Sequence, residues 1–399
     1  MNTNCLTLKI REPIPTTAAS IGVGNFSYII VGMLLFISCS KQKATEQTLS
    51  GLLVENFQTE VQGKKTDLFV LTNQKGMEVC ITNLGGRIVS IMVPDKNNLL
   101  QDVVLGFDSI QDYMKYPTDF GATIGRYANR INQGKITVEG KTYQLPQNNY
   151  GHCLHGGPNG FQYQVFNAEQ IDGKTLELTY LSEDKEEGFP GNLTCKVTFT
   201  LTDDNAIDIV YQATTDQTTV VNMTNHSYFN LNGNPALSNA NHILRIDADA
   251  YTPVDSTFMT TGEIESVEGT DMDFRTPITI GSRINNDSEQ LKYGKGYDHN
   301  WVLNTAGDIA RACATLYSPE TGIVLDVYTN EPGIQFYAGN FLDGTLVGKK
   351  NIIYGHRSAV CLETQKYPDT PNKQDWPSAL LKAGDTYHSR CIYKFTIEK

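Results

Sequence analysis

The sequence predicts an all-β protein built as one large antiparallel β-sandwich over residues 51–399. Short runs that alternate apolar and polar residues recur throughout this region, as in LTCKVTFTL at 193–201 and AIDIVYQATT at 206–215. That period of two is typical of half-buried strands. Turn residues separate the runs, for example TDDN at 202–205. No stretch of twelve or more residues shows a helical period with clear caps.

The predicted strands are spread evenly over this region. In chain order the runs are DLFVLTN, MEVCITN, RIVSIMVP, KITVEG, LELTYLS, LTCKVTFTL, AIDIVYQATT, HILRIDAD, IVLDVYTN and CIYKFTIE. No linker-like stretch divides them and no short repeat is present, so a single β-sandwich domain is expected at 51–399 rather than several smaller ones.

The first 39 residues are expected to form a signal peptide. Residues 28–38 read YIIVGMLLFIS, an apolar run of eleven that is shorter than the roughly 20 residues of a membrane-spanning helix. The run ends in FISC, which resembles the lipobox of bacterial lipoproteins, with Phe36 where Leu is usual. Cys39 is then the lipidated residue, and residues 40–50 form a polar tether. A plain secretory signal and a short membrane anchor remain alternatives.

Composition narrows the class of partner. The formal net charge of −12 argues against nucleic acid, because phosphate binding needs clustered Lys and Arg. A small uncharged ligand is the most consistent with this net negative charge. The eight cysteines form no C-x-x-C pair, and several lie in apolar runs. They are expected to be buried free thiols, although export would permit a disulfide.

Polar segments that interrupt the strand pattern are the candidates for chemistry. They are GRYANR at 125–130, LHGG at 154–157, TNHSYFNL at 224–231, YDHNW at 297–301, EPGIQFY at 331–337 and LETQ at 362–365. Each one alone is weak, because a single His or Asp on a strand is more often structural than catalytic. The segments become informative about function only when they are taken together, in their order along the chain.

That set resembles the aldose 1-epimerase, or galactose mutarotase, family. GRYANRI, YGHCLHGG, TNHSYFNLNG, YDHNWVL, EPGIQFYAGNFLDGT and LETQKYPDTPN occur in the family's order, and the resemblance covers about residues 52–398. It implies the family's large antiparallel supersandwich with a site in a cleft on one sheet. It also implies a free aldose such as glucose or galactose as substrate, with no cofactor and no metal.

The resemblance assigns roles residue by residue. His226 matches the general acid and Glu363 the general base. The positions that match substrate-binding residues are Asn129, Arg130, His155, Asp298 and Gln335. The leader is the departure from the pattern, since most cytoplasmic relatives lack one. It favours an exported, periplasmic protein that meets the membrane only through its lipid anchor, with a cytoplasmic protein as the alternative.

Other functions remain open from the residues alone. Asp298 and Glu363 supply the two carboxylates that a glycoside hydrolase needs. His152, His155, His226 and His299 offer ligands for zinc, although no H-E-x-x-H motif occurs. A lipid-anchored sugar-binding protein without catalysis is expected to lack His226 or Glu363. An epimerase of a phosphorylated hexose is expected to carry more Lys or Arg near the cleft.

Overall fold

The computed structural model describes residues 47–398. The signal peptide, Cys39 and most of the predicted tether therefore lie outside the described residues. Within the described part, no helix is long and apolar enough to span a membrane.

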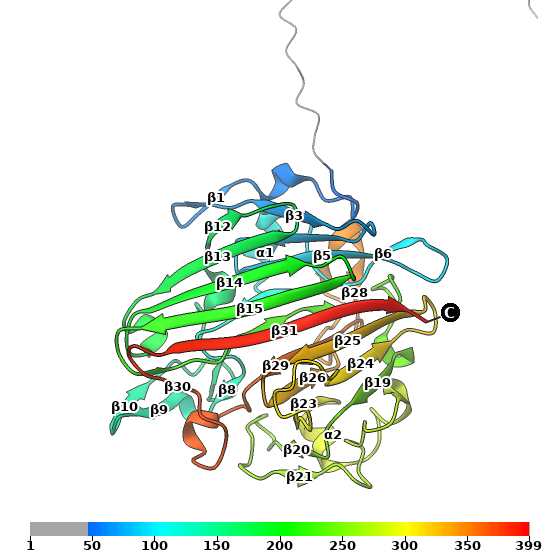
Figure 1. Ribbon diagram of the computed structural model, residues 1–399. Helices are drawn as coiled ribbons and strands as arrows, with labels where there is room; N and C mark the ends of the chain where they lie inside the picture. The colour runs from blue at the N-terminus through cyan, green and yellow to red at the C-terminus, as the bar shows by residue number, and fades with distance from the viewer. Residues whose placement is uncertain (1–46, 399) are drawn as a thin grey trace, which may run out of the picture. The chain divides into compact units, whose positions relative to one another are not determined.

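Three antiparallel sheets make up most of the domain (Figure 1). The largest has nine strands in the order β12 (Asn167–Gln170), β13 (Thr175–Ser182), β14 (Leu193–Leu201), β15 (Ala206–Thr215), β31 (Thr386–Ile397), β25 (Ile323–Thr329), β24 (Ala314–Tyr317), β19 (Ile243–Ile246) and β22 (Ile278–Thr279). The six-stranded sheet runs β18 (Tyr228–Phe229), β29 (Val360–Gln365), β26 (Gly333–Tyr337), β23 (Asp298–Val302), β20 (Ala250–Thr252) and β21 (Glu265–Ser266). The four-stranded sheet runs β3 (Leu68–Thr72), β4 (Glu78–Thr82), β5 (Arg87–Pro94) and β6 (Leu100–Asp102).

Short two-stranded ladders complete the sheet structure. They pair β7 (Ala122–Ile124) with β17 (Thr224–His226), β8 (Arg130–Ile131) with β11 (Cys153–Leu154), β9 (Lys135–Val138) with β10 (Lys141–Gln144), β16 (Thr219–Val220) with β30 (Leu380–Leu381), β27 (Leu346–Val347) with β28 (Ile353–Tyr354), and β1 (Glu60–Val61) with β2 (Lys64–Lys65). The α-helices of the described chain are α1 (Ile110–Lys115) and α2 (Glu289–Tyr293). The predicted all-β sandwich is confirmed.

The alternating pattern of β14 shows why these residues form a sandwich. Along Leu193–Leu201 every second side chain is buried, and the residues between them are partly or fully exposed. The buried set joins one core with side chains from the other two sheets, such as Ile91 on β5 and Leu362 on β29. One face of each sheet thus closes the hydrophobic core, and the other face is free to carry loops or a site.

The folded domain begins slightly before the expected residue 51. Ser50 is buried, and the Leu49 amide donates a hydrogen bond to Glu78 Oε1 at 2.8 Å. Residues 47–50 therefore belong to the domain and not to the tether, because the backbone of this turn donates to β4 and the Thr48 hydroxyl lies 2.8 Å from the Ser50 hydroxyl.

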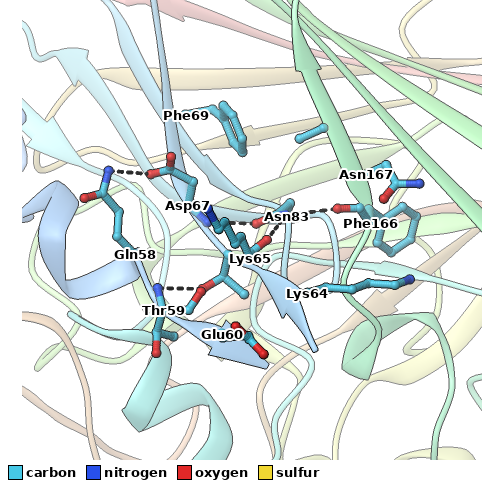
Figure 2. Close-up of a pocket in the computed structure, with 12 residues that line it drawn as sticks. Gln58, Thr59, Glu60, Lys64, Lys65, Asp67, Phe69, Asn83, Phe166 and Asn167 are labelled. Atoms are coloured by element: carbon cyan, nitrogen blue, oxygen red, sulfur yellow. Dashed lines mark hydrogen bonds between the residues drawn. The ribbon is translucent and has the colours of Figure 1, made fainter. Parts of the chain in front are cut away.

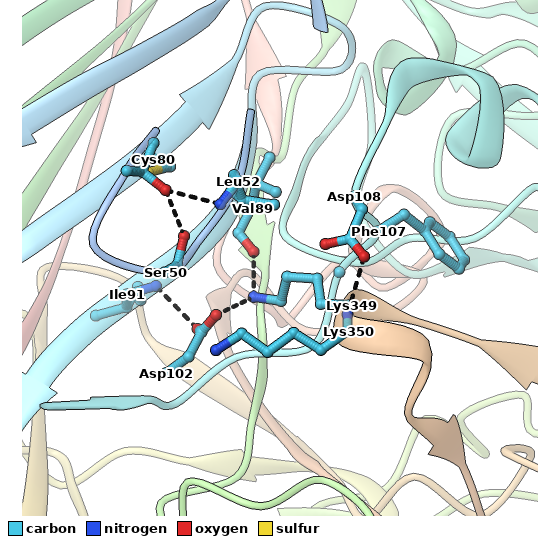
Figure 3. Close-up of polar contacts among 12 residues, drawn as sticks. Ser50, Leu52, Cys80, Val89, Ile91, Asp102, Phe107, Asp108, Lys349 and Lys350 are labelled. Atoms are coloured by element: carbon cyan, nitrogen blue, oxygen red, sulfur yellow. Dashed lines mark hydrogen bonds and ion pairs between the residues drawn. The ribbon is translucent and has the colours of Figure 1, made fainter. Parts of the chain in front are cut away.

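A buried ion pair ties the four-stranded sheet to a distant loop (Figure 3). Lys349 Nζ lies 2.6 Å from Asp102 Oδ2 and donates a second hydrogen bond to the Val89 carbonyl at 2.6 Å. Asp102 Oδ1 also accepts the Ile91 amide at 3.3 Å. Such a pair is stable in the interior only because its remaining donors and acceptors are satisfied.

Candidate active site

The predicted site residues come together on one face of the six-stranded sheet. In its register Asp298 lies opposite Tyr337, while Gln335 lies opposite Glu363. Directly opposed residues share a face, and so do residues two apart on one strand. Asp298, Gln335 and Glu363 therefore point to the same side of the sheet.

Trp301 points to the other side. It is fully buried in the main core, and its indole N–H donates to the Met272 carbonyl at 2.9 Å. Trp301 therefore packs in the core and does not line the cleft described below.

The remaining predicted residues come from the loops and short ladders that wall this face. His226 ends β17, which pairs with β7. Arg130 begins β8, and His155 directly follows β11, the partner strand of β8. Asn129 precedes β8, and its amide donates to His155 Nδ1 at 3.2 Å. These loop residues are thereby placed beside the face of the six-stranded sheet that carries Asp298, Gln335 and Glu363.

All seven predicted residues line one cleft with a volume of about 270 Å³. This volume lies near the lower end of the range for small-ligand pockets, about 300–1,000 Å³, and suits a monosaccharide. Seven further residues line the same cleft, and the sequence did not single them out: Asp119, Asn149, Tyr150, Leu154, Tyr228, Tyr337 and Phe341. Five of them lie within the motifs quoted above, but the motifs assign them no role, whereas Asp119 and Asn149 lie outside every motif and are identified only by the folded structure.

His226 and Glu363 lie next to each other in the cleft. His226 Nε2 lies 3.5 Å from Glu363 Oε1, and both side chains are almost fully buried. His226 Nδ1 and Glu363 Oε2 are buried without a hydrogen-bond partner among the described residues. The pair is therefore positioned to exchange protons with a bound molecule.

Burial sets the proton affinities of this pair. Desolvation lowers the pKa of His226, and the nearby Asp119 carboxylate works against that effect. Desolvation raises the pKa of Glu363 well above its usual range, with Asp298 and Asp119 adding to the rise and Arg130 opposing it. Burial thus shifts both groups toward their uncharged forms.

His155 is fixed as a hydrogen-bond donor. Its Nδ1 accepts the Asn129 amide, so in the neutral ring Nε2 carries the hydrogen. Burial lowers the pKa of His155 to about 3, which keeps the ring neutral near pH 7. His155 therefore offers one N–H to the cleft and is not a proton store.

The binding side of the cleft is prearranged. Gln335 Nε2 donates to Asp298 Oδ1 at 2.7 Å, and Arg130 Nε donates to Asn149 Oδ1 at 3.0 Å. Burial raises the pKa of Asp298, and Arg130 opposes that rise. Gln335 Oε1 is buried without a partner among the described residues, and so remains available to a ligand hydroxyl.

The four histidines of the metal alternative do not assemble. His152 and His299 are absent from the cleft, and the Nδ1 atom of each accepts a backbone amide. Asp119, His155 and His226 offer atoms within 4.8 Å of one another. Yet His155 Nε2 carries the hydrogen, so a metal there would have to break the bond from Asn129. The donor set therefore fits a metal poorly.

A larger hollow lies away from this chemistry (Figure 2). It has a volume of about 830 Å³ and is lined by residues of the β1–β2 hairpin and its neighbours, including Lys64, Lys65 and Phe69. Asn83 braces its floor, with Nδ2 donating to the Phe166 carbonyl at 2.9 Å and Oδ1 accepting the Asp67 amide at 2.9 Å. None of the predicted site residues lines it.

Comparison with known proteins identifies the family of the chain. The family model described as aldose 1-epimerase matches residues 67–394. The chain belongs to the aldose 1-epimerase family. The galactose mutarotase of Rattus norvegicus is 42% identical over 321 residues, which cover 80% of this chain and 92% of that protein. The aldose 1-epimerase of Escherichia coli (strain K12) is 38% identical over 338 residues, covering 84% of this chain and 97% of that protein.

A solved structure shows the same fold in this family. The GalM/aldose epimerase homologue from C. elegans superposes with a TM-score of 0.78 at 32% identity, covering 84% of this chain and 100% of that one. The family resemblance found in the sequence motifs is therefore confirmed, and with it the supersandwich fold.

Proposed function

We propose that this isomerase interconverts the α and β anomers of free aldohexoses such as glucose and galactose, with His226 as general acid and Glu363 as general base. The mutarotase activity follows from membership of the family. The observation that supports the two roles is the buried His226–Glu363 pair, 3.5 Å apart in a cleft of monosaccharide size.

Ring opening transfers two protons, one away from the C1 hydroxyl and one onto the ring oxygen. Glu363 takes the proton of the C1 hydroxyl while His226 gives a proton to the ring oxygen, and the bond from C1 to that oxygen breaks. Both oxygens are bonded to C1, so an acid and a base 3.5 Å apart reach them from one position. C1 becomes an aldehyde, rotates about the C1–C2 bond, and is attacked on its other face.

Ring closure restores the enzyme. His226 recovers its proton from the C5 hydroxyl, and Glu363 returns its proton to the C1 oxygen. The pair thus alternates between imidazolium with carboxylate and two neutral groups. Burial favours the neutral state, which is the state that accompanies the open-chain sugar. Desolvation therefore lowers the energy of that intermediate relative to the charged pair.

The other cleft residues bind hydroxyls in this proposal. Asp298, Gln335, Asn129 and Arg130 provide directional acceptors and donors, and His155 Nε2 provides a neutral donor. Among the cleft residues of the described chain, Arg130 is the one Lys or Arg, which favours an uncharged hexose over a phosphorylated one. The presence of both His226 and Glu363 disfavours a sugar-binding protein without catalysis.

Polarimetry of fresh α-glucose and α-galactose tests the proposal. The wild-type protein should accelerate mutarotation, with a bell-shaped dependence of kcat/KM on pH. His226→Ala and Glu363→Gln should each lose about 10²- to 10⁴-fold in kcat. A Glu363→Gln variant with near-normal turnover contradicts the assigned base. Release of sugar from an aryl glycoside by the wild type would instead favour a hydrolase.

We also propose that the protein is exported and tethered by a lipid on Cys39. The support is the uncharged apolar run at 28–38 and the FISC sequence that ends it. Replacement of Cys39 by Ala should leave mutarotation intact and release the protein from the membrane fraction. Mass spectrometry of the native protein should find no unmodified peptide that contains residues 1–39.

A further inference from the structure

Asp119 is a third carboxylate in the cleft that none of the family-like motifs contains. Its carboxylate oxygen lies within 4.8 Å of ring nitrogens of both His155 and His226. Asp119 Oδ1 is buried and has no hydrogen-bond partner among the described residues. A carboxylate held in this way acts on its neighbours through its charge.

Hydrogen bonds hold the backbone on both sides of Asp119. Arg87 is fully buried on β5, and its Nη1 donates to the carbonyls of Thr118 at 2.9 Å and Phe120 at 3.1 Å. The Asp119 carbonyl itself accepts the Ala122 amide at 3.0 Å. The backbone on both sides of Asp119 is therefore fixed, which sets the position from which its side chain enters the cleft.

The same loop is joined to the strand of the general acid. Gly121 N donates to the His226 carbonyl at 3.0 Å, and Ala122 lies opposite His226 in the β7–β17 ladder. Asp119 and His226 are thus positioned by one piece of backbone. Their separation does not depend on a flexible side chain elsewhere.

Few other groups near His226 carry charge at neutral pH. The Tyr228 ring stacks on the imidazole with centroids 5.0 Å apart, and the Cys361 thiol lies within 4.8 Å. Burial raises the pKa of both Tyr228 and Cys361 well above the usual range, so both stay protonated.

The ionisable groups that remain around His226 are Glu363, His155, Arg87 and Asp119. Burial lowers the pKa of His155 to about 3, which leaves that ring neutral. Arg87 disfavours the imidazolium, so Asp119 is the carboxylate besides Glu363 that stabilises it.

Asp119 counteracts the effect of burial on the pKa of His226, and Arg130 counteracts it on the pKa of Glu363. Burial drives His226 and Glu363 toward the neutral state, but each turnover also requires the imidazolium and the carboxylate. Asp119 stabilises the imidazolium but also disfavours the Glu363 carboxylate, and Arg130 stabilises that carboxylate in turn. With both charges present, the charged and neutral states come closer in energy and proton exchange in either direction is easier.

We propose that Asp119 is an electrostatic positioning residue for this mutarotase, whose charge keeps the imidazolium of His226 accessible in the buried cleft. The inference rests on the proposed acid role of His226. It names Asp119 as part of the machinery through its effect on His226, and not as a group that touches the reacting atoms.

The test is the pH dependence of kcat/KM for Asp119→Asn. A nearby negative charge raises the pKa of both His226 and Glu363. Its loss should move both limbs of the bell to lower pH by about one unit. Asp119→Glu should keep both limbs near their wild-type positions. Asp172→Asn is the matched control, because it removes the same charge at the exposed β12–β13 turn and should leave the profile unchanged.

A second readout does not depend on turnover. In Glu363→Gln protein, nitrogen-15 NMR of the His226 ring follows its titration without the coupled carboxylate. Adding Asp119→Asn to that protein should lower the midpoint by about one pH unit. An unchanged midpoint overturns the inference.

Three kinetic outcomes also overturn it. They are a profile for Asp119→Asn that superposes on the wild type, a loss of kcat that is the same at every pH, and a rise in KM alone. The last would mean that Asp119 binds a sugar hydroxyl. Failure of the proposed function looks different, because the wild-type protein itself would then not accelerate mutarotation.

Discussion

At the scale of single residues, environment and not residue type decides the role. GRYANR contains two buried arginines with different functions. Arg126 donates to the carbonyls of Pro190 and Gly191, both at 2.9 Å, and thereby joins loops. Arg130 faces the cleft and acts on Asp298 and Glu363. The family resemblance assigns only Arg130 to substrate binding, and the structure gives the physical reason, because Arg126 is used up in joining loops while Arg130 lines the cleft.

His155 provides a prediction at this scale. Because Nε2 is a fixed neutral donor, His155→Ala should lower kcat/KM by roughly 10²-fold while both limbs of the pH profile stay in place. His155→Gln, which keeps an N–H group, should recover part of the loss. Steady-state polarimetry from pH 5 to 9 checks both variants. Displacement of a limb in His155→Ala would mean that the His155 proton moves during turnover.

At the scale of elements, glycines bring the loops of the cleft close together. Gly156 has φ of +79°, and a Cβ there would lie 2.1 Å from the Gly125 carbonyl oxygen. Gly140, in the β9–β10 turn, has φ of +77° and open space around it. The two positions share the same backbone requirement, but only Gly156 adds a steric one.

That difference gives a paired prediction. Gly140→Ala should cost about 1 kcal/mol of unfolding free energy, from backbone strain alone, and keep full activity. Gly156→Ala should cost more and also lower kcat/KM, because the clash displaces the adjacent His155. Urea unfolding and polarimetry measure the two effects. Equal losses in both variants would show that the contact with Gly125 is unimportant.

At the scale of the whole molecule, buried neutral histidines make the fold sensitive to acid. His242 accepts the Leu231 amide through Nε2 at 2.9 Å, and burial lowers its pKa to about 4. An unfolded histidine binds a proton near pH 6.5, so from there down to about pH 4 the unfolded state binds more protons than the folded one. Stability is therefore present above about pH 6.5 and is lost as the pH falls.

The corresponding prediction concerns urea unfolding at pH 7 and pH 5. His242 alone should make the wild-type protein lose about 2 kcal/mol of unfolding free energy between these pH values. His242→Gln should be less stable at pH 7 but show a weaker pH dependence. His388→Gln, at an exposed position of β31, is the matched control and should keep the wild-type dependence. An unaltered dependence in His242→Gln would contradict the prediction.

The sequence by itself predicted the strands, and its motifs indicated His226 and Glu363 as the proposed acid and base. The period of two in β14 and β15 is a local property, since adjacent residues must face opposite sides of a sheet. The motifs around His226 and Glu363 are local as well. The two faces of β23 also follow from alternation, with Asn300 and Trp301 on opposite sides of the sheet although both are buried.

Only the tertiary structure decided which distant residues share the cleft. Asp119 lies in a short turn, and nothing in its neighbouring residues marks it as functional. It reaches His226 because the long-range contacts of Arg87 and the β7–β17 ladder bring the two segments together. The sequence alone predicts Ser50 to lie in the tether, because the burial of Ser50 also depends on a long-range contact, its packing against β4. The protonation balance of His226 and Glu363 is likewise a tertiary property, because desolvation and Coulomb interactions depend on distances in space and not on order along the chain.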